Sequence, residues 1–111
     1  MTLLTGCATA RSQPDCDCAG FGKLQAQKRT DPSFNIRAAA ASLQQMTEAA
    51  CLPRYYEMLA EALMIERDPD SAESCLQKAV AWYQTNKCPV TAYRNYYHKR
   101  AILQRNRGNY T

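Results

Sequence analysis

The chain has little of what most enzyme active sites and cofactor sites require. It contains one histidine, His98, and four glycines, none of them in a glycine-rich loop that would cradle a phosphate. A single histidine cannot form a His–His metal pair. No stretch approaches the roughly 18 consecutive apolar residues of a membrane-spanning helix. We therefore expect no catalytic residue, no metal and no cofactor, and we favour a binding function.

A large excess of one sign of charge is also missing. Fourteen Lys and Arg residues against ten Asp and Glu residues give a formal net charge of +4 at pH 7. So small an excess allows an acidic partner or a membrane surface, but it does not indicate binding to nucleic acid. The chain has 111 residues, of which about twenty are expected to lie outside the fold, so it predicts one small domain.

Cysteine, in contrast, is abundant. The six cysteines are Cys7, Cys16, Cys18, Cys51, Cys75 and Cys88. This density is ordinary in secreted or periplasmic proteins and unusual in cytosolic ones, where thiols stay reduced. The Cys16-Asp17-Cys18 motif predicts a disulfide staple between the N-terminal segment and the body of the protein. A zinc site is the weaker interpretation, because the spacing is C-x-C rather than C-x-x-C.

Four residues near the start, Leu4-Thr5-Gly6-Cys7, resemble a bacterial lipobox. The resemblance implies that residues 1–7 are the remnant of a lipoprotein signal and that Cys7 carries the lipid. It also implies a place in the bacterial cell envelope, at the periplasmic face of the outer membrane. Either the chain begins inside the signal or the match is accidental, because only Met1-Thr2-Leu3-Leu4 precede the small residues.

The rest of the chain divides into a loop segment and a helical domain. Residues 8–32 are expected to form a tether and loop, because prolines and glycines interrupt them and no apolar period is sustained. Residues 33–108 are expected to form an all-α domain of four helices, because apolar residues recur there at helical spacing. The expected helices cover residues 32–52, 53–67, 70–86 and 89–108, with Asp70 and Glu73 capping the third and Gly108 ending the fourth.

Residues 53–86 resemble a tetratricopeptide repeat, a helix-turn-helix unit of about 34 residues. The residues that carry the resemblance are Tyr56, Leu59, Ala60, Leu63, Ala72, Leu76 and Ala79. A shift by one repeat places Val90, Tyr93 and Tyr97 on the positions of Tyr56, Leu59 and Leu63. The resemblance implies stacked helical hairpins, in which the small residues let neighbouring helices touch. An ordinary four-helix bundle is the alternative.

The repeat-like geometry also implies a pairing of the cysteines. Cys51 and Cys88 each precede a proline that opens a helix, and they lie one repeat apart, so a Cys51–Cys88 disulfide is feasible. Cys75 lies at the opposite end of the stack, and its expected partner is Cys18 or Cys16.

In tetratricopeptide proteins the first helix of each repeat lines a concave groove. The groove positions that the resemblance implies are Arg54, Glu57, Glu61 and Met64 from one helix, and Thr91, Asn95 and His98 from the next. A groove this short holds one peptide or one helix of a partner. The simpler interpretation makes the glutamates a solvated helix face and makes His98 an ordinary surface residue.

The C-terminal segment is a second candidate surface, because arginines are interleaved there with tyrosines. Tyr96 and Arg100 are its candidate contact residues, since tyrosine and arginine are enriched in interface hot spots. The alternative is a charged outer face that covers a core seam filled by tyrosines.

These observations lead to one expected function and one alternative. We expect an outer-membrane lipoprotein that is a non-catalytic adaptor or assembly factor, pilotin-like or accessory, of a secretion, pilus or conjugation machine. Its partner is then a protein, such as a secretin, pilus or transfer-channel component, and its membrane contact is the N-terminal lipid. The alternative is an exclusion or immunity lipoprotein that blocks an incoming channel or toxin.

Overall fold

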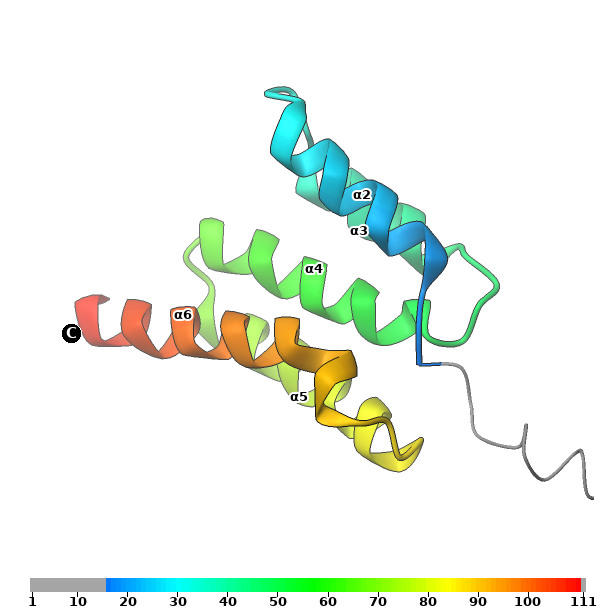
Figure 1. The fold of residues 1–111 in the computed structure, drawn as a ribbon. Coiled ribbons are helices and arrows are strands. Elements are labelled where there is room, and N and C mark those ends of the chain that lie inside the picture. Colours follow the sequence, from blue (N-terminus) through cyan, green and yellow to red (C-terminus); the bar gives the residue numbers. More distant parts are fainter. Residues whose placement is uncertain (1–15, 111) are drawn as a thin grey trace, which may run out of the picture.

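The computed structural model describes residues 16–110, and within that range the protein is entirely helical, without a strand (Figure 1). The expected all-α class is therefore confirmed. The elements are α2 (Ala19–Thr30), α3 (Ile36–Gln44), α4 (Cys51–Ile65), α5 (Pro69–Thr85), the short 3-10 helix η1 (Val90–Tyr93) and α6 (Arg94–Tyr110). The expected lipid-bearing residue, Cys7, lies outside the described residues.

Helix α2 occupies a segment that was expected to be loop, so the described part of the chain has five α-helices rather than four. The helix buries none of its own residues completely, and only Phe21 and Leu24 pack against the apolar core. Its sequence therefore lacks the apolar stripe by which an amphipathic helix is recognised. Lys28 and Arg29 lie in its last turn, where positive charge is favourable next to the helix dipole.

The first expected helix, over residues 32–52, is shorter in the structure. A turn precedes it, in which the Asp31 carboxylate accepts from the backbone N–H of Ser33 at 2.9 Å. The Asn35 side chain then caps α3 by accepting from the N–H of Ala38 at 3.0 Å. Residues 45–50 form a loop before α4 begins at Cys51. Local capping therefore moves the start of α3 by one turn, and the loop lets the chain reverse.

Two similar turns connect α4 to α5 and α5 to η1. Each contains a residue with positive φ, Arg67 at 62° and Lys87 at 56°, where glycine is more usual. The cap of α5 is Asp68, which accepts from the N–H of Ser71 at 3.2 Å, and not the expected Asp70. Gly108 does not end α6, which continues to Tyr110.

Successive helices run in opposite directions, so α2, α4 and α6 point one way while α3 and α5 point the other (Figure 1). Helix α4 is central, because it contacts α2, α3, α5 and α6. Ala60 of α4 and Ala72 and Ala79 of α5 are fully buried, as their spacing predicts. These small side chains let α4 and α5 approach closely.

Two apolar clusters form the core, one between α2, α3 and α4 and the other between α4, α5, η1 and α6. Leu59 and Trp82 pack against both clusters and connect them. In the second cluster the ring of Tyr83 stacks on that of Tyr93, with the centroids 4.7 Å apart. A core seam filled by tyrosines, which is the alternative given above for the C-terminal segment, is thus present.

Two disulfides fasten the N-terminal segment to the body of the protein, as the C-x-C motif predicts. The pairs are Cys16–Cys88 and Cys18–Cys51. The expected Cys51–Cys88 disulfide is wrong, because each of these two cysteines instead bonds to one cysteine of the C-x-C motif. The expected pairing of Cys75 is also wrong: Cys75 is buried in α5 as a free thiol, and burial raises its pKa.

The connectivity predicts a specific set of linked peptides. Cleavage before Asp17 separates Cys16 from Cys18, so each disulfide can be assigned to its own pair. We expect a Cys16–Cys88 peptide and a Cys18–Cys51 peptide under non-reducing conditions, with a gain of two hydrogens per disulfide on reduction. Mass spectrometry of the digest measures this, and a Cys51–Cys88 peptide would contradict the structure.

Candidate functional site

Helices α2, α4 and α6 together line a groove of about 430 Å³, here named the central groove. Its lining residues are Gln25, Lys28, Glu61, Met64, Ile65, Asn95, His98, Lys99, Ile102 and Asn106. The three helices point in the same direction (Figure 1), so the groove lies along their length and takes side chains from successive turns of each.

The lining of the central groove combines apolar and polar groups. Ile65 is 67% exposed, the partly buried Ile102 adds further apolar surface, and Met64, only 8% exposed, lies beneath them. Gln25, Asn95 and Asn106 offer amide groups that both donate and accept hydrogen bonds. Such a lining suits a peptide, because it can hold an apolar side chain and hydrogen-bond a backbone at the same time.

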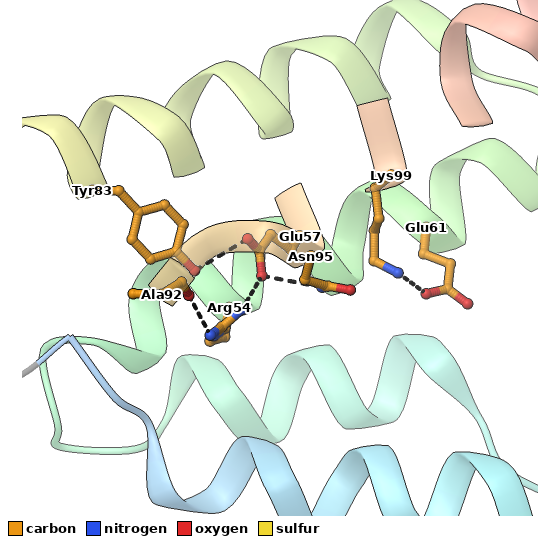
Figure 2. Close-up of polar contacts among 7 residues, drawn as sticks. All are labelled: Arg54, Glu57, Glu61, Tyr83, Ala92, Asn95 and Lys99. Atoms are coloured by element: carbon orange, nitrogen blue, oxygen red, sulfur yellow. Dashed lines mark hydrogen bonds and ion pairs between the residues drawn. The ribbon is translucent and has the colours of Figure 1, made fainter. Parts of the chain in front are cut away.

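An ion bridge crosses the groove between all three helices. The Glu61 carboxylate of α4 contacts the ammonium groups of Lys28 from α2 and Lys99 from α6. The Lys99 Nζ atom lies 2.5 Å from Glu61 Oε1 (Figure 2), and Lys99 is only 6% exposed. Burial acts to raise the pKa of Glu61, but the hydrogen bonds from Lys28 and Lys99 outweigh it and lower that pKa below its usual value. Glu61 therefore stays ionised and holds the three helices together.

A second carboxylate, that of Glu57, is completely buried one helical turn away from Glu61. Figure 2 shows three side chains that donate to it: Arg54 at 3.0 Å, Tyr83 at 3.1 Å and Asn95 at 3.3 Å. A buried charge is tolerated only when it is paired and hydrogen-bonded, and these contacts meet that requirement. The network joins α4, α5 and α6 beneath the groove residue Asn95.

Arg54 connects this network to two further elements. Its Nη2 atom donates to the backbone carbonyl of Ala92 at 2.8 Å, and its guanidinium lies 4.5 Å from the centre of the Phe21 ring in α2. Burial and the neighbouring Glu57 carboxylate raise the pKa of Tyr83 far above its usual value. The Tyr83 hydroxyl therefore remains a proton donor to Glu57 over the whole physiological pH range.

Four of the predicted groove residues, Glu61, Met64, Asn95 and His98, line the central groove. Glu57 is completely buried and does not line the central groove, so its predicted place in the groove is wrong, and so is its alternative interpretation as part of a solvated face. The reason is that Arg54 and Tyr83 supply the hydrogen bonds that solvent would otherwise provide. Arg54 itself is partly buried in the same network.

The remaining predicted residues lie elsewhere. Thr91 lines a separate cavity with Arg54 and Cys16, outside the central groove. Tyr96 is buried, and its hydroxyl accepts a hydrogen bond from the exposed Arg100 at 3.0 Å. The tyrosine of this candidate pair thus belongs to the core seam, and only Arg100 is open to a partner.

Six lining residues of the groove were not among the candidate contact residues. Gln25 and Lys28 were missed because α2 was expected to be loop, and Ile65 and Lys99 because only the repeat's usual positions were carried over. The sequence did contain a signal from which Ile102 and Asn106 could have been predicted. They continue from Asn95 and His98 at a spacing of three to four residues, which keeps side chains on one face of a helix.

Comparisons with known proteins assign no family to this chain. No protein-family model, no curated protein and no solved structure matches it. None of the helices in residues 16–110 combines the length and the apolar character needed to cross a lipid bilayer. The function is therefore argued from the groove and its surroundings.

The buried Glu57 network predicts a large effect on stability. Glu57→Ala leaves the charge of Arg54 and the hydroxyl of Tyr83 without their acceptor, so we expect the free energy of unfolding to fall by about 3–5 kcal/mol. Urea denaturation with both disulfides intact measures this. Glu66→Ala is the matched control, since Glu66 pairs with Arg37 at the exposed surface, and it should stay near wild type. Equal midpoints for the two variants would contradict the role of the network.

The Glu61 bridge predicts a pH dependence of stability. The pKa of Glu61 in the folded state lies below the ordinary value of 4.5, so its stabilisation is present above that pH and is lost as the pH falls through the folded pKa. Glu61→Gln should lower the melting temperature clearly at neutral pH. The gap to wild type should close in acid, as followed by circular dichroism. A gap that stays constant with pH, or an equal gap for the exposed Glu73→Gln control, would contradict this account.

Proposed function

We propose that this protein is a non-catalytic adaptor that captures one peptide segment or one helix of a partner protein in the central groove. The observation that carries the proposal is the groove itself, which is about 430 Å³ in volume and is lined by three helices that point the same way. Its apolar and amide groups suit an amphipathic segment, and its walls are fixed beforehand by the Glu61 bridge. Preorganisation of this kind lowers the entropic cost of binding.

The resemblance to tetratricopeptide repeats supports the same proposal. Under this interpretation α4 and α5 form one repeat, α2 and α3 form a repeat-like hairpin before it, and α6 begins the next. The alternating helix directions and the buried Ala60, Ala72 and Ala79 agree with this interpretation. The first helices of the three units are then α2, α4 and α6, the helices that line the central groove.

We further propose that the adaptor is a lipoprotein of the bacterial envelope, anchored through Cys7 at the periplasmic face of the outer membrane. The two disulfides support an oxidising compartment. The partner is then a component of a secretion, pilus or conjugation machine, such as a secretin subunit. The lipid would hold the groove near the membrane in which that component assembles.

One observation favours the alternative function, exclusion or immunity. Val90 of η1 and Tyr97 of α6 are exposed large side chains outside the central groove, 57% and 47% exposed. They lie near the exposed Arg94 and Arg100 in the chain. A surface of this kind suits contact with the folded surface of a channel or toxin rather than with a peptide.

Two neighbouring residues distinguish the proposals. His98 lines the central groove, whereas Tyr97 stacks on Tyr93 outside it. We expect a photo-crosslinking residue at His98, in cells that express the native gene, to link the protein to a component of an envelope machine. Ile65→Asp should reduce that product about tenfold or more, because it places a charge at the apolar part of the groove.

The control for this experiment is Leu52→Asp, an exposed apolar position of α4 outside the central groove. It should leave the crosslinked product unchanged, and circular dichroism should show that both variants are folded. Crosslinking at Tyr97 that is insensitive to Ile65→Asp would contradict the adaptor proposal and support the exclusion or immunity alternative.

A further inference from the structure

Four potential metal-binding atoms gather where α2 and α4 begin. The Cys18 and Cys51 sulfurs and a carboxylate oxygen of Glu48 all lie within 4.8 Å of one another. The Met46 sulfur lies 3.7 Å from the Cys51 sulfur. Cys18 precedes α2, Cys51 is the first residue of α4, and Glu48 lies in the loop between α3 and α4. None of these residues lines the central groove.

We propose that Cys18, Cys51 and Glu48 bind one Zn²⁺ ion when the Cys18–Cys51 disulfide is reduced. Thiolates and carboxylates are both zinc ligands, at about 2.3 Å and about 2.0–2.2 Å respectively, so two ligand atoms of a tetrahedral ion lie about 3.3–3.8 Å apart. The Glu48 Oε1 atom lies 3.7 Å from the Cys51 sulfur, which agrees with this separation. After reduction, rotation of the two cysteine side chains would separate the sulfurs, which are bonded to each other in the disulfide. Glu48 is exposed, so a water molecule can reach the ion as the fourth ligand.

The carboxylate is already oriented toward the sulfurs while the disulfide is closed. Glu48 Oε1 accepts from the backbone N–H of Ala19 at 3.2 Å and lies 3.7 Å from the Cys51 sulfur. The backbone carbonyl of Glu48 also accepts from the N–H of Cys51 at 3.0 Å. The loop therefore holds Glu48 beside both cysteines before any metal binds.

Reduction must precede the metal. A dithiol donates two electrons and two protons to the Cys18–Cys51 bond, so that the S–S bond breaks, two thiols form and the dithiol leaves as its own disulfide. Zn²⁺ then displaces the two thiol protons and adds the Glu48 carboxylate. The ion would thereby replace the disulfide as the link between the start of α2 and the start of α4.

The other disulfide provides a comparison inside the same molecule. Among the described residues, no similar group of metal ligands includes Cys16 or Cys88. Reduction turns both pairs into dithiols, but among the described residues only Cys18 and Cys51 form a group with a carboxylate oxygen in which all the ligand atoms lie within 4.8 Å of one another. The proposal therefore depends on Glu48 and not on thiols alone.

The test is a zinc titration of the reduced protein against a chromophoric chelator. We expect one Zn²⁺ per reduced chain, none for the oxidised chain, and an affinity lowered about tenfold or more by Glu48→Gln. Glu48→Gln keeps every cysteine and can still accept from Ala19, so its oxidised form should fold. Glu73→Gln is the matched control for loss of an exposed carboxylate, and it should bind zinc like wild type.

Three outcomes would overturn the proposal. Equal zinc affinity in Glu48→Gln and wild type would mean that any dithiol, including one in an unfolded chain, accounts for binding. Retention of binding in a Cys18→Ala/Cys51→Ala variant would place the ion elsewhere. Strong preference for Cu⁺ over Zn²⁺, lost in Met46→Leu, would indicate an all-sulfur copper site instead.

Discussion

The Cys18–Cys51 disulfide is the constraint on which the arrangement of this protein most depends. Helix α2 buries none of its own residues completely and packs only Phe21 and Leu24 against the core, so its apolar packing is limited. The disulfide fixes its first turn to the start of α4, and Cys16–Cys88 fixes the adjacent segment to the turn before η1. Small domains commonly use such cross-links where the core is limited. Here the cross-link supplies one wall of the central groove.

Two carboxylates of α4 connect the helices in the body of the molecule. Glu61 links α2 to α6 through Lys28 and Lys99, and the buried Glu57 links α4 to α5 and α6 through Tyr83 and Asn95. They lie one helical turn apart, so both project from the same side of α4. The same short stretch of α4 therefore supplies both the ion bridge that crosses the central groove and the buried network beside it.

The sequence predicts the helical class and the two helices of the α4–α5 hairpin, because apolar and small side chains recur there at helical spacing. The four groove residues follow instead from the resemblance to a tetratricopeptide repeat. It does not predict α2, since a helix held by a disulfide and by Lys28 needs no apolar period. It does not predict the burial of Glu57 either, because that depends on Arg54, Tyr83 and Asn95, which are brought together only by the fold. The predicted disulfide pairs were wrong for the same reason. The sequence did not predict α2, and Cys18, which directly precedes α2, bonds to Cys51.

Hydrogen–deuterium exchange on a Cys18→Ala/Cys51→Ala variant tests the central claim most directly, the claim that a disulfide and not apolar packing holds α2 in place. We predict that the amides of α2 lose most of their protection relative to wild type, while those of α4 and α5 keep theirs, because local and global opening have separate free energies. Unchanged protection of α2 would contradict the account, and so would equal loss of protection across α2, α4 and α5.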